Sequence, residues 1–289
     1  MNQLATMKTD VFDKVLNVVV GYASSGVIDL PRDYSVGNAV KSAWVKLQEV
    51  TDRAGKPVLE VCTKPSIINA LMDMCCQGLN PAKNQCYFIA YGSKLTLMRS
   101  YFGSMHVAKT VDPAITDITY DVVYEGDVFE YEKKRGKTVI ATHRQKLENV
   151  DKAKILAAYC SIWRGDEETT TIMTFDEIKQ AWSKSQVKPV LESGEIKAGS
   201  THGQFTADMS IRTVVNKACK YVINSSSDNT VLNSAFTRSA EEQTEEEIAE
   251  NANKIYVDFE DSAADEQPEP QAERREEQPG EQPKGADPF

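Results

Sequence analysis

The sequence predicts an α+β protein, in which a small antiparallel sheet packs with helices and a disordered acidic tail follows. Apolar residues recur every three or four positions in some segments and alternate with polar residues in others, which predicts helices and strands respectively. Residues 240–289 contain no Leu or Trp and five of the eleven prolines, within long runs of Glu, Gln and Pro. Such a segment buries too little apolar surface to offset its chain entropy, which predicts the tail.

Three helices are expected in the first third of the chain. The first covers residues 2–22 and has the apolar stripe Leu4, Met7, Val11, Val15 and Val18. The second has the stripe Val40, Ala43, Trp44, Leu47 and Val50. The third begins after Thr63 with Pro65 in its first turn, and Gly78 suits its C-terminal cap. Its expected buried face consists of Ile68, Leu71, Met72 and Cys75.

The middle of the chain predicts antiparallel strands joined by tight turns. Gly92-Ser93 and Gly165-Asp166 are two-residue links suited to hairpins. Further turns are expected at Glu125-Gly126-Asp127 and at Arg135-Gly136. The expected strands lie at residues 86–91, 94–100, 118–124, 129–132, 138–142, 155–164 and 170–173.

Two more helices follow the strands. Thr174 and Glu177 form a capping box that opens the first of them. The second covers about residues 205–222, with the apolar stripe Ile211, Val214, Val215, Ala218 and Val222. The polar residues expected on its opposite face are Thr213, Asn216, Lys217 and Lys220, with Arg212 beside them. This pattern therefore predicts that the polar residues of the helix form a ridge that contacts phosphates.

The net charge of −10 is unevenly distributed along the chain. Residues 240–289 hold 17 acidic and 4 basic side chains, a net −13. Residues 1–239, the body of the protein, hold the remaining 26 acidic and 29 basic side chains, a net +3. Residues 133–154 alone carry eight basic and two acidic side chains, a net +6. A mildly basic body is compatible with a polyanionic partner, whose affinity would fall steeply with salt. A solvated hairpin tip is the alternative for the cations of residues 133–137.

Several classes of protein are disfavoured. The six cysteines are dispersed, and no run of about eighteen apolar residues or basic N-terminal leader occurs, so we expect a reduced, cytosolic protein without a membrane partner. The sequence has no Gly-rich phosphate loop, Cys-x-x-Cys pair or nucleophile elbow. A zinc site built from His106, His143 and His202 with Cys62 or Cys86 is an alternative, although these residues lack ligand spacing.

Aromatic residues lie beside cations and polar residues at two places in the sequence. Tyr101-Phe102 lies near Arg99 and Lys109, and Phe205 lies near His202 and Gln204. Stacking of bases on aromatic rings holds single strands without reading their sequence. The alternative is that these rings belong to the core.

The motifs occur in an order that resembles the RecT family of phage single-strand annealing recombinases, over residues 63–221. Gly78-Leu79-Asn80-Pro81 is similar to the family's helix and turn, and Tyr87–Tyr91 with Leu95, Leu97 and Gly103 to its hairpin and next helix. The other matching segments are Val123–Asp127 with Phe129, Ala157-Ala158-Tyr159, and Met209 with Thr213, Val214 and Lys220-Tyr221. Ser100-Tyr101-Phe102-Gly103 lacks a cation usual in the family, Phe205 replaces a common Trp, and Ile211-Arg212 replaces paired lysines.

The resemblance implies a fold similar to other single-strand annealing proteins and a non-catalytic function. It implies binding of single-stranded DNA, annealing to duplex without ATP, and homo-oligomers that form rings or helical filaments in the bacterial cytoplasm. No cofactor is expected, with magnesium only as an aid to annealing, and a phage exonuclease is the expected partner. Arg212, Thr213, Asn216, Lys217 and Lys220 would bind phosphates, with Lys109, Arg144 and Lys146 on an opposite wall, and Arg99, Tyr101, His202, Gln204 and Phe205 as further DNA contacts.

The expected organisation has four parts. Residues 1–52 form a helical part with possible subunit contacts, residues 53–225 the DNA-binding core, residues 226–239 a linker, and residues 240–289 the tail. The end Asp287-Pro288-Phe289 resembles, over three residues, the tip of bacterial single-stranded DNA-binding proteins, which suggests host partners of that system. A second hypothesis is that the tail competes electrostatically with DNA. A metal-dependent DNA-processing enzyme and a coat protein that never pairs strands are the alternative functions.

Overall fold

The computed structural model describes residues 3–26, 30–31, 33–52, 54–185 and 188–226, with side chains from Asp10 onward. The predicted tail and all but the first residue of the predicted linker lie outside the described residues. The helices are α1 Gln3–Ser24, α2 Val36–Leu47, α3 Val58–Val61, α4 Lys64–Cys76, α5 Tyr101–Val111, α6 Phe175–Ser183, α7 Thr201–Gln204 and α8 Thr206–Ser225, with short 3₁₀ turns η1 Pro81–Lys83 and η2 Leu147–Asn149. The strands are β1 Cys86–Tyr91, β2 Lys94–Arg99, β3 Asp117–Tyr124, β4 Val128–Lys134, β5 Lys137–Arg144, β6 Ile155–Arg164 and β7 Glu167–Thr174.

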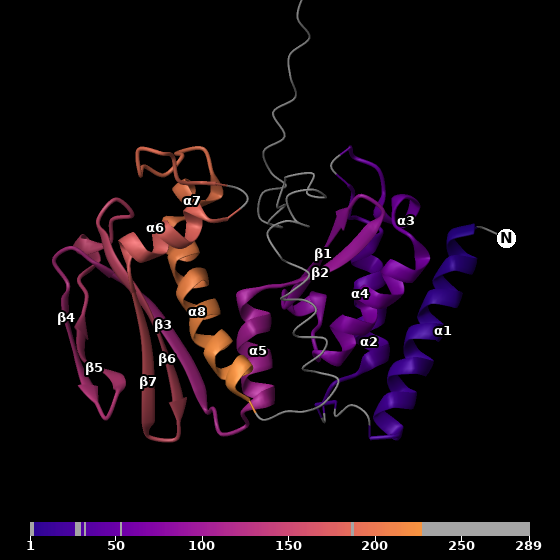
Figure 1. Ribbon diagram of the computed structural model, residues 1–289, viewed down its shortest axis with the longest axis horizontal. Coiled ribbons are helices and arrows are strands. Elements are labelled where there is room, and N and C mark those ends of the chain that lie inside the picture. The colour runs from indigo at the N-terminus through magenta and orange to yellow at the C-terminus, as the bar shows by residue number, and fades with distance from the viewer. Residues whose placement is uncertain (1–2, 27–29, 32, 53, 186–187, 227–289) are drawn as a thin grey trace, which may run out of the picture. The chain divides into compact units, whose positions relative to one another are not determined.

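The N-terminal helices pack on one another and on the β1–β2 hairpin (Figure 1). In α1 the buried side chains are Val11, Val15 and Val19, so the stripe runs through Val19 and leaves Val18 half-buried. The N-terminal cap of α4 is Thr63, whose side chain accepts a hydrogen bond from the Ser66 backbone. At the other end Gly78 takes a left-handed φ of 65°, as expected of a helix-terminating glycine.

All strand pairs among the described residues are antiparallel. They form a β3-β6-β7 sheet, a β1–β2 hairpin and a β4–β5 hairpin. The hairpin links at Gly92-Ser93 and Gly165-Asp166 and the turn at Arg135-Gly136 lie where the sequence predicts them. The prediction of an α+β protein with small antiparallel sheets packed with helices is thereby confirmed.

The sheet lies between a helical layer and the β4–β5 hairpin (Figure 1). One face presents Ala158, Cys160 and Ile162 to α8, and all three are buried. The opposite face presents Tyr159, which stacks on Phe129 of β4 at a centroid distance of 5.6 Å. Because side chains alternate along a strand, β6 contributes to both layers.

The buried apolar side chains form one cluster that extends from α1 to α8. It includes Val11 of α1, Leu71 of α4, Leu97 of β2 and Val214 of α8, so the predicted helical N-terminal part shares a core with the later elements. Among the described residues, no helix has the length and apolar character needed to cross a membrane.

Candidate nucleic-acid interface

The central helix α8 is enclosed on more than one side, which corrects the simple amphipathic prediction. It lies between the sheet and α5, with α6 against its N-terminal half (Figure 1). Its buried residues are Thr206, Met209, Ser210, Val214, Val215, Ala218, Cys219 and Ile223, which surround most of the helix. The periodicity of the sequence revealed the face toward the sheet but not the second face toward α5, because small and polar residues form that contact.

Three residues of the predicted ridge make contacts inside the protein. The Thr213 hydroxyl accepts a 2.8 Å hydrogen bond from Trp182 Nε1 and donates to the Met209 carbonyl. Asn216 Oδ1 accepts a 2.8 Å bond from the Ser104 hydroxyl of α5, and Arg212 donates to the Tyr87 hydroxyl of β1 at 3.1 Å. These side chains therefore join α8 to its neighbours, and whether any of them also contacts DNA stays a prediction.

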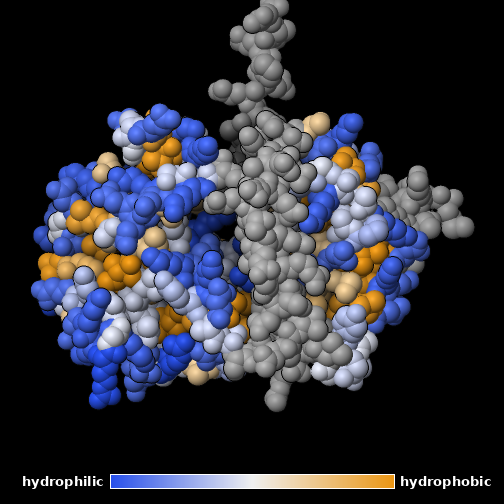
Figure 2. Space-filling model, in the orientation of Figure 1, coloured by the Kyte–Doolittle hydropathy of each residue, from blue (hydrophilic) through white to orange (hydrophobic). Residues whose placement is uncertain are grey.

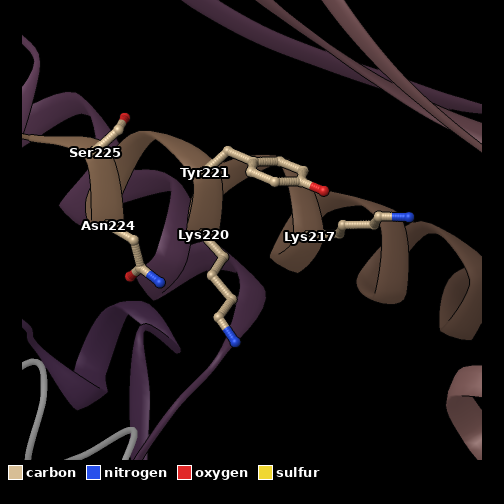
Figure 3. Close-up of a pocket in the computed structure, with 5 residues that line it drawn as sticks. All are labelled: Lys217, Lys220, Tyr221, Asn224 and Ser225. Carbon is tan, nitrogen blue, oxygen red and sulfur yellow. The ribbon is translucent and has the colours of Figure 1, made fainter.

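The two lysines of the ridge have a different environment. Lys217 and Lys220 line a groove of about 410 Å³ along the last turns of α8, together with Tyr221, Asn224 and Ser225. Lys220 and Asn224 extend from the same side of the helix (Figure 3). Within the described part of the chain, neither lysine forms an ion pair with a carboxylate. The groove therefore offers two cationic amines, an amide, a hydroxyl and an aromatic ring, which is a suitable set for sugar–phosphate contacts.

The predicted contacts near α5 differ in accessibility. Lys109 lies in the last turn of α5. This helix runs beside α8, and the two helices have their C-terminal ends on the same side of the molecule (Figure 1). The Lys109 amine is 3.7 Å from the Asp117 carboxylate. Arg99 is partly buried and donates to Gln77, and desolvation lowers the pKa of its guanidinium. The Tyr101 ring packs against the core and against Tyr120, whereas the neighbouring Phe102 is 42% exposed.

Arg144 and Lys146 are not brought to the α8 groove. They lie at the end of β5 and just beyond it, and the β4–β5 hairpin occupies the sheet face opposite α8. The sheet thus lies between these two cations and α8, so of the three residues predicted for the opposite wall only Lys109 lies on an element that packs against α8. The sequence could not reveal this because the direction in which a hairpin folds over a sheet depends on contacts distant in sequence.

Carboxylates lie close to several cations of the basic segment. Lys134 pairs with Glu132, Lys137 with Glu167, Lys146 with Glu148, and Lys154 with Glu125. Lys152 donates to the Gly203 carbonyl at 3.4 Å. Three of these carboxylates, Glu125, Glu132 and Glu167, lie outside residues 133–154. The local positive charge is therefore smaller than the net +6 of this segment implies.

His202, Gln204 and Phe205 gather at the N-terminal end of α8. His202 and Gln204 belong to α7, and the His202 ring lies 4.8 Å from the Trp182 ring, edge to face. Gln204 is exposed and Phe205 is 44% exposed. A helix rises 1.5 Å per residue, so Phe205 and Lys217 are about 18 Å apart along α8. The structure thus places these three residues at the other end of the helix from the lysine groove.

Asp127, in the predicted Glu-Gly-Asp turn, organises the junction between β3, β4 and β5. Its carboxylate accepts hydrogen bonds from the Tyr124 backbone at 2.9 Å, Asn149 at 2.9 Å and Gln145 at 3.0 Å. His143 Nε2 lies 3.4 Å away, and its Nδ1 lies 3.0 Å from the Tyr159 hydroxyl. Desolvation raises the pKa of Asp127, but these hydrogen bonds outweigh it and hold the pKa below its ordinary value.

The histidines considered for a zinc site belong to three different elements: His106 to α5, His143 to β5 and His202 to α7. Among the described residues, no three or more His, Cys, Asp or Glu side chains converge in a way that would hold a metal ion. All six cysteines are buried, and no disulfide joins any two of them. Burial raises the pKa of Cys62 to about 11 and the pKa values of Cys75 and Cys219 to about 12.

The structure adds groove residues that the sequence analysis did not select. Tyr221 is 63% exposed and lies beside Lys220, and Asn224 and Ser225 extend the groove past the predicted end of the helix at residue 222. The position of Tyr221 next to Lys220, beside the apolar stripe, was the available signal. Figure 2 shows that hydrophilic residues dominate the visible face of the molecule, with small hydrophobic patches between them.

The sequence of the chain matches a known protein family. The model of the RecT family matches residues 37–254, about three quarters of the chain, and the chain belongs to this family. The match begins within α2, earlier than the resemblance seen in the sequence motifs. No curated protein and no solved structure matches the chain. Membership of the RecT family implies binding of single-stranded DNA and single-strand annealing in phage recombination.

Proposed function

We propose that this protein anneals complementary DNA strands without ATP and without catalysing a covalent reaction, working as an oligomer or filament. In this proposal it acts in the bacterial cytoplasm on strands exposed by a phage exonuclease, with the host single-stranded DNA-binding protein or its partners nearby. Annealing needs no nucleotide hydrolysis because stacking in the product duplex supplies about 1.4 kcal/mol per base-pair step. Magnesium would assist only by screening phosphate repulsion.

The observation that carries the proposal is the lysine groove of α8 within a RecT family chain. Lys217 and Lys220 belong to a helix that is packed on several sides, so their backbone positions are set before DNA binds. Amines, amides and hydroxyls are among the groups that contact phosphate and sugar oxygens, and such contacts do not depend on the base sequence. Bases held in this way stay available to pair with a second strand.

The first experiment tests the activity. Labelled complementary oligonucleotides are mixed with the protein and magnesium in the absence of nucleotide, and duplex formation and strand length are followed together. Faster duplex formation with intact strands is expected. Cleaved strands would instead support a metal-dependent processing enzyme, and strands that are protected from nuclease but do not pair would support a coat protein.

The second experiment tests the groove. The double variant Lys217→Gln/Lys220→Gln should bind oligonucleotides of unrelated sequence more weakly and to a similar extent. Each lost phosphate contact on single strands reduces the slope of log affinity against log salt by about 0.7, so the slope should fall by about 1.4. Lys41→Gln/Lys56→Gln is the matched control, because both lysines are exposed and lie outside the groove. Equal slopes in the two variants would place the DNA elsewhere.

A further inference from the structure

The lysine groove lies at the point where the described chain ends. Its last two residues, Asn224 and Ser225, are followed by Ser226, the final described residue. The first strongly acidic segment of the remaining chain, residues 241–250, holds six glutamates and no basic residue. A cationic groove and a highly anionic segment of the same chain are therefore separated by only a short connection.

The connection is long enough to allow return of the acidic segment to the groove. Glu241 is 15 residues beyond Ser226, and an extended chain spans at most about 3.6 Å per residue, which gives a reach of about 54 Å. The groove itself extends over nine residues of α8, from Lys217 to Ser225, or about 12 Å at 1.5 Å per residue. Every part of the groove thus lies within reach of residues 241–250.

Charge favours this segment over other parts of the molecule. Several exposed cations have carboxylates within ion-pairing distance, such as Lys109 with Asp117, Lys146 with Glu148, and Lys154 with Glu125. Lys217 and Lys220 have no such carboxylate among the described residues. Carboxylates from residues 241–250 would supply these two ammonium groups with opposite charges.

We propose that residues 241–250 dock in the groove of Lys217 and Lys220 and thereby compete with single-stranded DNA for it. This autoinhibitory contact rests on the proposed function only insofar as DNA uses the same groove. An effective concentration on the order of 1 mM and a docking constant on the order of 0.1 mM reduce apparent DNA affinity about tenfold. Both interactions are electrostatic, so the inhibition is strongest at low salt.

The test uses the full-length chain, with all six glutamates of residues 241–250 changed to glutamine. This neutralised protein should bind a single-stranded oligonucleotide about tenfold more tightly than the wild type at low salt, and the gain should shrink as salt rises. In the Lys217→Gln/Lys220→Gln background the gain should vanish, and in the Lys41→Gln/Lys56→Gln background it should persist. A gain of equal size in both backgrounds would mean that the acidic segment repels DNA in general, and this would overturn the proposal. The absence of a gain in every background would overturn it too.

A second measurement separates docking from DNA binding. A fluorescent peptide of residues 241–250 is titrated into the neutralised protein without DNA, and its anisotropy should rise at low salt unless Lys217 and Lys220 are replaced. If the peptide needs these lysines but DNA does not, docking stands and the proposed DNA groove fails. If DNA binding needs these lysines but the peptide does not bind, the proposed DNA groove stands and the docking proposal fails. A gain that depends on protein concentration would assign the docking to a second copy and overturn the intramolecular contact.

Discussion

Among single residues, Gly103 shows how closely α5 packs against the ends of the β1–β2 hairpin. It lies in the first turn of α5, and a Cβ atom placed there would be 2.1 Å from the Gln85 carbonyl oxygen and 2.8 Å from Arg99 Cγ. The first of these neighbours is backbone and cannot rotate away. Any larger residue must therefore move α5 away from the β1–β2 hairpin, and α5 is the helix that packs on α8.

We predict that Gly103→Ala lowers the free energy of unfolding by about 3 kcal/mol, at the upper end of the overpacking range, because backbone must shift. Urea unfolding followed by circular dichroism measures the change. Gly37→Ala in α2 is the matched control, since a Cβ atom at Gly37 has nothing within 4 Å. The control should be neutral or gain up to about 1 kcal/mol from helix propensity. Equal stability of the two variants would contradict the close approach seen at Gly103.

Contacts of individual side chains also explain why the sequence could reveal only part of the site. The pattern identified Lys217 and Lys220, which line the groove, from their place on a helix face. It grouped Thr213 and Asn216 with them, because a helical pattern shows the direction of a side chain but not the partner that meets it. Their partners, Trp182 and Ser104, are 31 and 112 residues away in sequence, beyond any local pattern.

At the scale of elements, the Glu-Gly-Asp turn controls how the β4–β5 hairpin lies on the sheet. Gly126 takes a φ of 93°, and its Asn149 neighbour lies 3.0 Å from where a Cβ atom would be. The following Asp127 receives hydrogen bonds from β3, from the end of β5 and from η2. One carboxylate thus fastens three elements, which explains why the motif combines a glycine and an aspartate.

We predict that Asp127→Asn lowers the free energy of unfolding by about 1–3 kcal/mol at pH 7, since an amide group faces donors that had paired with a carboxylate oxygen. Thermal or urea unfolding of the full-length protein measures the loss. Asp166→Asn in the exposed β6–β7 turn is the control and should change stability by less than about 0.5 kcal/mol. A control loss as large as that of Asp127→Asn would show that a general charge effect is responsible.

The same substitution makes a prediction about pH. Because the folded pKa of Asp127 is lowered, its stabilising contribution is complete above the ordinary carboxyl pKa of about 3.9 and is lost as pH falls through the folded value. The stability difference between wild type and Asp127→Asn should therefore shrink as the pH falls below about pH 4. Unfolding curves at each pH test this, and a difference that grows on acidification has the wrong sign.

Most elements could be predicted from the sequence because their signals are local. The capping box of Thr174 and Glu177, the glycine cap at Gly78 and the Gly92-Ser93 link each act within a few residues, and the structure has all three. The arrangement of the elements could not be predicted in the same way. That β4–β5 covers one sheet face while α8 covers the other depends on contacts such as Phe129 with Tyr159, which no spacing encodes.

At the scale of the whole molecule, α8 joins the N-terminal helices to the sheet. Its Asn216 contacts α5, its Arg212 contacts β1, and its Cys219 lies near Cys160 of β6. The buried side chains form one continuous cluster through these contacts. A displacement of α8 would therefore disturb both parts of the core.

The six cysteines allow this continuity to be tested without substitutions. Four of them, Cys62, Cys75, Cys76 and Cys86, lie among the N-terminal elements, whereas Cys160 and Cys219 lie in the sheet and in α8. All are buried, and burial raises the pKa of Cys75 and of Cys219 to about 12, so each thiol should resist alkylation at pH 8 until the protein unfolds.

We predict that all six thiols become reactive at the same urea concentration, because a single core exposes them in one cooperative transition. Pulsed alkylation at increasing urea, followed by mass spectrometry of the peptides, gives a midpoint for each cysteine. Circular dichroism on the same samples provides the global midpoint for comparison. If Cys62, Cys75, Cys76 and Cys86 react well before Cys160 and Cys219, the N-terminal helices unfold separately, and α8 does not couple the two parts of the core.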